Sequence, residues 1–160
     1  MGMIRFSEDG YPRSLQLDGV DPAVVGAAVR MGAEDDLADH VDLSCGCRVP
    51  KVTREGGGAA LPYKRRLFEA IVTAAVRAAA PANIPVTIKM RIGIDDDHVT
   101  FLEAGRIAED AGVAAIGLHA RPAQQHHSGS ARWAAIAELE QAIGSIPVLR
   151  HGDIFRAADA

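Results

Sequence analysis

Aromatic residues are scarce in this chain, at 4% of its 160 residues. The hydrophobic fraction is nevertheless 48%, and most of it is Ala, Val, Ile and Leu, which favours helices packed on buried parallel strands. The chain also lacks an excess of positive charge, because its net charge is −4. An RNA partner would therefore have to be held by a local patch and not by the chain as a whole.

Cysteine is nearly absent as well, with only Cys45 and Cys47 in the chain. These two are poorly placed to bridge each other, which argues against a disulfide framework and fits a reducing cytoplasm. A single C-x-C pair is not a structural zinc site, and we expect no metal. No apolar run approaches the roughly 20 residues that span a bilayer, so we expect no membrane partner.

The sequence does contain a repeated strand-then-helix pattern. Five strands are predicted, centred near residues 16, 42, 88, 117 and 149. The predicted helices cover residues 21–29, 64–79, 95–112, 131–143 and 155–160. This alternation indicates a parallel α/β sheet, which occurs both in the (β/α)8 barrel and in the doubly wound fold.

Chemically capable side chains end or follow nearly every predicted strand. They are Gln16, Cys47, Lys89, Arg91, His119, Arg121, His151 and Asp153. Barrel enzymes collect their active sites from several strand ends in this way, whereas a doubly wound fold more often concentrates its signature on one glycine-rich turn. Five strands cannot close a barrel, which usually needs about 250 residues. We therefore predict a partial TIM barrel, one incomplete domain over residues 1–160.

Two of these strand ends allow opposing interpretations on their residues alone. Cys47 is either a reactive thiol or a small buried apolar residue. Lys89 and Arg91 share one face of an otherwise apolar strand, where a charge is costly unless it is paired or binds a ligand. The alternatives are an anionic ligand, which we favour, and an internal salt bridge to Asp42 or Asp153.

The last two strand ends are also ambiguous. His119 can hydrogen-bond a cofactor, but a single histidine at a strand end is more often structural. Gly152 lets backbone amides approach a ligand, while Asp153 can simply cap the next helix. The run Gly56–Gly58 is not a P-loop, because no G-K-[ST] follows it.

Six segments, in order and at matching spacing, resemble the tRNA-dihydrouridine synthases, a family of flavin-binding barrels. The segments are Pro12–Leu17, Val41–Leu61, Val86–Gly93, Leu118–Arg121, Ser128–Gly129 with Trp133, and Ile146–Leu149 with Gly152–Ile154. The resemblance implies that the five strands are the third to the seventh of the barrel. It also implies that the family's C-terminal helical, tRNA-binding domain is absent from this chain.

The resemblance implies an oxidoreductase of tRNA processing. In that family NADPH reduces bound FMN, a hydride passes to carbon 6 of a uracil flipped out of the tRNA, and a cysteine protonates carbon 5. The family's cysteine falls on Cys47, and a free thiol is mostly protonated at neutral pH. The flavin contacts fall on Gln16, Lys89, His119, His151, Gly152 and Asp153, and we assign Ser44, Arg91 and Arg121 to the substrate.

This chain departs from the family pattern at a few positions. Ser44 replaces an asparagine, Arg48 a proline, and Arg150-His151 a Gly-Asn pair, so that Arg150 is expected to occupy space needed by the cofactor. The missing strands are expected to leave two open sheet edges and to promote self-association. Three interpretations follow: a dihydrouridine synthase whose activity as this piece is in doubt, another flavin barrel similar to dihydroorotate dehydrogenases, and a non-catalytic remnant.

Overall fold

The computed structural model describes residues 10–125 and 128–156. Its strands are β1 (Ser14–Leu17), β2 (His40–Cys45), β3 (Val86–Arg91), β4 (Ala115–His119) and β5 (Val148–His151). Its α-helices are α1 (Pro22–Glu34), α2 (Pro50–Arg54), α3 (Arg65–Ala79), α4 (Phe101–Ala111) and α5 (Ala134–Ala142). Two 3-10 helices, η1 (Gly58–Tyr63) and η2 (Ala80–Ala82), flank α3.

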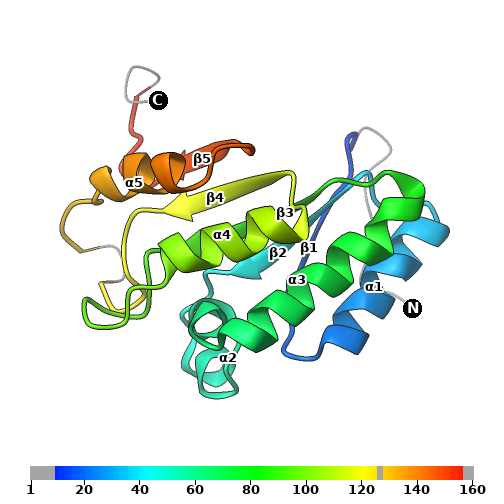
Figure 1. Cartoon of the computed structure of the whole chain (residues 1–160), viewed down its shortest axis with the longest axis horizontal. Helices are drawn as coiled ribbons and strands as arrows, with labels where there is room; N and C mark the ends of the chain where they lie inside the picture. Colours follow the sequence, from blue (N-terminus) through cyan, green and yellow to red (C-terminus); the bar gives the residue numbers. More distant parts are fainter. Residues whose placement is uncertain (1–9, 126–127, 157–160) are drawn as a thin grey trace.

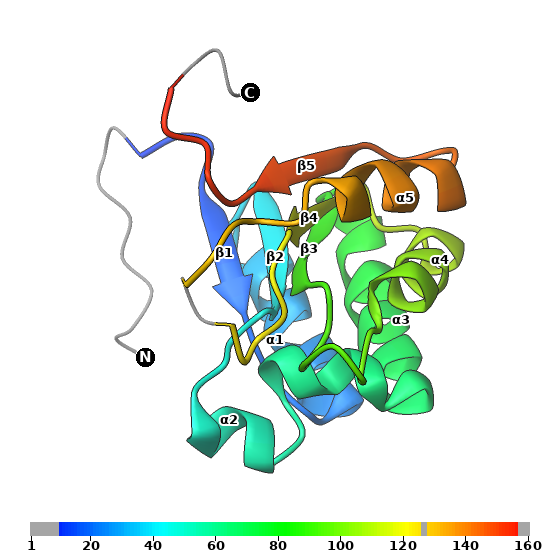
Figure 2. The ribbon, with the colours of Figure 1, turned by 90° about the vertical axis from the view of Figure 1, so that its left-hand side faces the viewer.

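The five strands form one parallel sheet in chain order, β1 to β5. Helices α1, α3, α4 and α5 lie on the same side of this sheet (Figures 1 and 2). Each of them packs on the next, α1 on α3, α3 on α4 and α4 on α5. A doubly wound fold would place helices on both faces. The arrangement is therefore part of a (β/α)8 barrel, as the sequence predicted.

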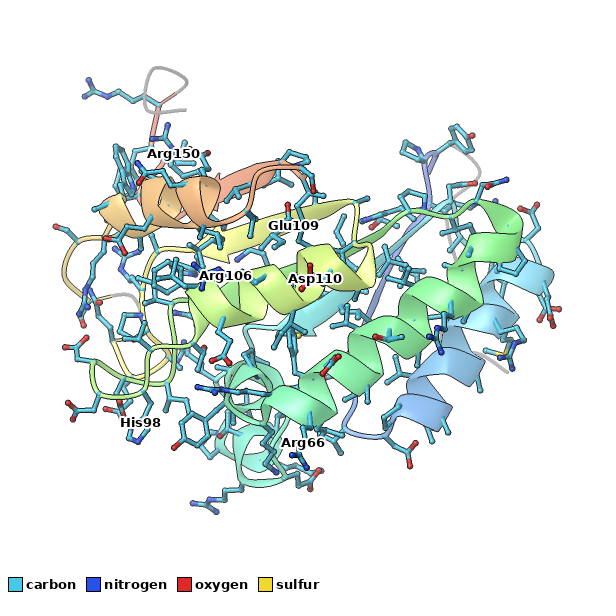
Figure 3. All side chains as sticks on the ribbon, viewed as in Figure 1. Arg66, His98, Arg106, Glu109, Asp110 and Arg150 are labelled. Carbon is cyan, nitrogen blue, oxygen red and sulfur yellow. The ribbon has the colours of Figure 1, made fainter. Side chains whose placement is uncertain are left out.

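The core lies between the sheet and these helices. Ile88 and Met90 of β3 and Ile116 and Leu118 of β4 are fully buried, and they meet Phe68 of α3. Because side chains alternate along a strand, the residues between them point to the opposite face. That inner face is where the polar strand residues gather. On the solvent side of α4, Arg106 and Asp110 point away from the core (Figure 3).

Local signals set several helix ends. Asp21 caps α1 by accepting hydrogen bonds from the amides of Ala23 and Val24 at 2.8 and 3.1 Å, a role that suits an aspartate. Gly112 ends α4 in the left-handed conformation, with φ of 89°, as predicted. Among the described residues, no helix is long and apolar enough to cross a membrane.

Four predicted helix boundaries were wrong. Helix α1 continues to Glu34, beyond the predicted range 21–29. Asp95–Asp97 do not begin α4, which starts at Phe101; instead, Asp95 closes a turn by accepting hydrogen bonds from the amides of Asp97 and His98. The predicted helix over 131–143 starts three residues later, at Ala134. Residues 155 and 156 are not helical, and residues 157–160 of that prediction lie outside the described part. Helices α2 and η1 were not predicted.

We predict that the chain self-associates through β1 and β5. Each of these strands pairs with one neighbour only in the described structure, and a strand edge without a partner offers its amides and carbonyls to another chain. Leu149 of β5 is also 58% exposed. Sedimentation velocity should show a mass that rises with concentration, and Leu149→Lys should reduce this rise. Val24→Lys, a change at an exposed site on α1, is the control; equal behaviour of the two variants would contradict the prediction.

Candidate functional site

The strand register aligns the inner-face residues in three rows across the sheet. Gln16, Asp42 and Thr87 occupy one row. Ser44, Lys89 and Gly117 occupy the next, and Arg91, His119 and His151 lie at the carboxyl ends of their strands. The structure therefore brings together residues that are far apart in the sequence. This is the edge of the sheet at which barrel enzymes carry their active sites.

A continuous hydrogen-bonded chain crosses the lower part of this face. Ser14 contacts His40 Nδ1 at 2.7 Å, and His40 Nε2 contacts the Thr87 hydroxyl at 2.9 Å. Thr87 donates to one Asp42 oxygen, and Gln16 donates to the other, both at 2.7 Å. Both Asp42 oxygens are thus occupied. Because the amide nitrogen of Gln16 donates to Asp42, its carbonyl oxygen remains available as an acceptor.

Lys89 is the cation of this face that has neither a hydrogen bond nor an ion pair in the described structure. Its ammonium makes no hydrogen bond or ion pair with any described residue, and the predicted salt bridge to Asp42 or Asp153 does not form. Burial, and next the charge of Arg91, lower the pKa of Lys89 to about 8. Gly117 makes room for the side chain, since a Cβ there would lie 2.7 Å from Lys89 Cδ. An anionic ligand would relieve this unpaired charge.

Arg91 is buried and bonded to the protein itself. Its Nε donates to the Gly46 carbonyl at 3.1 Å, and its Nη1 donates to the Pro122 carbonyl at 3.4 Å. The side chain therefore ties the loop after β2 to the loop after β4. Burial, followed by the neighbouring charges of Arg48 and Arg121, lowers the pKa of Arg91. The predicted substrate contact must compete with these two bonds.

His119 and His151 meet at the carboxyl ends of β4 and β5. Their rings form an edge-to-face pair with centroids 4.6 Å apart. Burial of His119 lowers its pKa to about 3, and the positive charge of Arg91 is the next largest cause of this shift. His119 is therefore neutral at physiological pH, and its ring nitrogens comprise one donor and one acceptor.

Arg121 and Asp153 link the loops that follow β4 and β5. Arg121 is buried and donates to Asp153 at 2.5 Å and to the Gly129 carbonyl at 2.8 Å. The other Asp153 oxygen accepts the Ala131 amide at 2.6 Å. These bonds lower the pKa of Asp153, the Ala131 amide most strongly. Asp153 therefore joins two loops and is not the cap of a following helix in the described residues.

The backbone is unusual where β5 ends. Gly152 has φ of 110° and Asp153 has φ of 57°. A Cβ on Gly152 would lie 3.2 Å from His119 Cδ2, so the backbone approaches the histidine closely, as a glycine permits. A cavity of about 360 Å³ is lined here by His119, Arg121, His151, Gly152, Asp153, Ile154 and Phe155.

Cys47 lies just beyond β2, half-buried, and both cysteines are free thiols. Cys45 is fully buried on the helix side, and burial raises its pKa to about 12. Only Cys47 is thus available for chemistry at this edge. In the described residues, no group of three or more His, Cys, Asp or Glu side chains could hold a metal ion.

The expectation that Arg150 occupies cofactor space was wrong. Arg150 pairs with Leu118, a residue of the helix side, and its guanidinium lies over the Trp133 ring, 4.6 Å from the centroid. Figure 3 shows it beside α5. The Trp133 indole donates in turn to the Gly152 carbonyl at 3.0 Å. Strand alternation, which assigns Arg150 to the face opposite His151, could have revealed this from the sequence.

We predict an acid-side loss of stability that depends on His119. The folded pKa is about 3, against 6.5 for the ordinary group, so the unfolded chain binds more protons between these values. The free energy of unfolding therefore falls as pH drops from about 6.5 to about 3. His119→Gln removes this titration and should flatten the fall. Urea unfolding at several pH values measures it; His98→Gln, at an exposed histidine, serves as control, and parallel curves for wild type and His119→Gln would contradict the assignment.

The chain is similar to known proteins over most of its length. A family model described as dihydrouridine synthase (Dus) matches residues 1–160. A probable tRNA-dihydrouridine synthase of Mycobacterium leprae is 61% identical over 158 residues, covering 99% of this chain and 41% of the relative. One from Treponema pallidum is 36% identical, covering 99% and 48%, and a tRNA-dihydrouridine synthase B of Xanthomonas axonopodis is 40% identical, covering 89% and 42%. This chain thus spans less than half the length of these relatives, and it belongs to the dihydrouridine synthase family.

Proposed function

We propose that the protein containing this chain reduces uridine to dihydrouridine in tRNA, with FMN as its cofactor and NADPH as its reductant. The observation that carries the proposal is the ammonium of Lys89. It is half-buried and unpaired within the described structure, and it shares the carboxyl edge of the sheet with Cys47. The names of the relatives supply the tRNA substrate, and a cytoplasmic location accords with that substrate.

The residues present fit a flavin. Lys89 offers a positive charge to an electron-rich part of the ring system, which suits the anionic reduced form. Gln16 has its carbonyl oxygen left for a donor, because Asp42 takes its amide hydrogen. His119, which is neutral, and His151 supply ring nitrogens beside the cavity. Gly152 exposes backbone there, and the Asp153 carboxylate, bonded to Arg121 and to the Ala131 amide, holds that backbone in place.

When bound, the flavin would supply the hydride that adds to carbon 6 of the uracil. Cys47 holds the proton that carbon 5 requires. Its S–H bond breaks as the C–H bond forms, the C5=C6 π bond is consumed, and the resulting thiolate regains a proton from water. Ser44, on the inner face beside Lys89, can hydrogen-bond a uracil carbonyl. Arg91 and Arg121 contribute mainly by holding loops, since Nε and Nη1 of Arg91 and Nη2 of Arg121 already bind protein.

We expect Lys89→Met to weaken FMN binding by roughly tenfold or more, because it removes a partly desolvated charge facing the ligand. Binding is followed by quenching of flavin fluorescence and by flavin that stays with the protein through gel filtration. Lys89→Arg should retain most of the affinity. Lys64→Met, which removes an exposed lysine at the start of α3, is the control. Equal affinities for Lys89→Met and Lys64→Met would remove the main support for the flavin site.

We expect Cys47→Ala to lower uridine reduction by about 100-fold or more, because a general acid typically contributes about 10²–10⁴-fold. Dihydrouridine is quantified by mass spectrometry of digested tRNA after incubation with FMN and NADPH. NADPH oxidation without tRNA should be unchanged, because the thiol takes no part in it. Cys45→Ala tests the buried cysteine and should keep its turnover if the protein remains folded. Full activity of Cys47→Ala would exclude the thiol as the acid.

A further inference from the structure

The peptide groups on both sides of Cys47 are held by different parts of the fold. The carbonyl before it, on Gly46, accepts the Arg91 Nε at 3.1 Å. The carbonyl of Cys47 itself accepts the amide of Ala59 at 2.8 Å. One donor belongs to the inner face of β3, and the other belongs to the backbone of η1. Together they restrict both backbone dihedrals of Cys47, and hence the direction of its Cα–Cβ bond.

Gly58 is pressed directly against Cys47. A Cβ on Gly58 would lie 2.3 Å from the Cys47 carbonyl oxygen and 2.9 Å from Cys47 Cβ, distances that real Cβ atoms essentially never show. Because one of these contacts is with backbone, a rotamer change cannot relieve it. Gly58 also has φ of 54°, a left-handed conformation that glycine adopts at little cost. Space and backbone conformation thus both require glycine.

The far ends of this support are fixed as well. Arg91 is buried, and its Nη1 donates to the Pro122 carbonyl, so the guanidinium cannot swing away freely. On the other side, η1 is anchored by the buried side chain of Leu61. The neighbouring amide of Gly57 donates to the Val52 carbonyl at 3.0 Å, which joins α2 to η1. The loop of Cys47 is therefore held between two rigid elements.

We infer that Gly58 and Arg91 are positioning residues for Cys47, a two-sided clamp that fixes where its thiol delivers a proton. The inference rests on the proposed function for the meaning of that proton, but the clamp itself is a property of this chain. A proton donor has to be held within about 0.5 Å of its productive position, and a cysteine on an unsupported loop would not be. Arg91 is thereby assigned to the cysteine loop and not primarily to the substrate.

The clamp is tested first without cofactor or substrate. Asparagine tolerates a left-handed backbone, so Gly58→Asn isolates the steric conflict with Cys47 from backbone strain. We expect the Ala59 amide to lose roughly tenfold of its protection from hydrogen exchange, because the conflict separates η1 from the loop. Alkylation of Cys47 by iodoacetamide at neutral pH should rise by a similar factor. Cys45 stays silent because it is buried, and Cys47→Ser confirms the assignment of the signal.

The matched control is Gly112→Asn. Gly112 also has positive φ, 89°, but a Cβ there would meet only Val76 at 3.6 Å. It should leave the Ala59 exchange and the Cys47 alkylation within about twofold of wild type, with any loss confined to the end of α4. If Gly58→Asn behaves like Gly112→Asn, the clamp is overturned. Exchange of the buried α3 amides shows whether either variant has unfolded, and a variant whose α3 protection is retained decides the comparison.

Arg91 is tested by substitution and rescue. Arg91→Met should deprotect the Ala59 amide by several-fold, because the Gly46 carbonyl loses its donor, whereas Arg91→Lys keeps one donor and should restore most of the protection. If the Ala59 amide exchanges equally fast in Arg91→Met and Arg91→Lys, Arg91 is not part of the clamp. With tRNA, FMN and NADPH, Gly58→Asn should lower kcat for uridine reduction and leave KM for tRNA unchanged. If the variants alter the Ala59 exchange but the wild type reduces no uridine, the proposed function is rejected and the clamp stands.

Discussion

The structure depends on the alternation of side chains along five parallel strands in one register. One face is apolar and is covered by α1, α3, α4 and α5, so the hydrophobic effect fixes which residues point toward the helices. The other face is then left with the polar residues, and the register places them in rows. A shift of one residue in β3 would put Lys89 and Arg91 into the helix layer and Ile88 on the polar face. The burial of Ile88 and Met90 thus also positions the lysine.

The carboxyl edge concentrates positive charge, which a stable protein would avoid without a reason. Lys89, Arg91 and Arg121 lie close enough to influence the pKa of His119, which stays neutral in response. Of these three cations, only Arg121 has a carboxylate partner in the described structure, Asp153. Arg91 is bonded to carbonyl dipoles, which compensate a cation only in part. Lys89 is therefore the cation of this edge without a direct partner in the described structure, and an anionic ligand would stabilise its charge.

Much of this could be predicted from the sequence, for identifiable reasons. The predicted strand centres all fall within the observed strands, because short apolar segments bounded by turn residues are strong local signals. The beginning of α4 was predicted too early, because Asp95–Asp97 suggest a helix start from charge alone, whereas the chain first closes a turn. Helices α2 and η1 escaped prediction because they are short and lie in a segment rich in glycine and proline. The hydrogen-bonded chain of Ser14, His40, Thr87 and Asp42 was missed because it depends on the register between strands.

The site residues divide along a physical line that the sequence does not show. A side chain's donors can bind a ligand or the protein's own carbonyls, and the residue type is the same in both cases. Lys89 and Arg91 are two residues apart on one face of β3. The Lys89 ammonium has no direct partner in the described structure, whereas the Arg91 guanidinium is bonded to backbone carbonyls of the loops after β2 and β4. Arginine suits the second task because its rigid fork can hold two carbonyls at once. The same strand therefore supplies one unpaired charge and one support for the loop of Cys47.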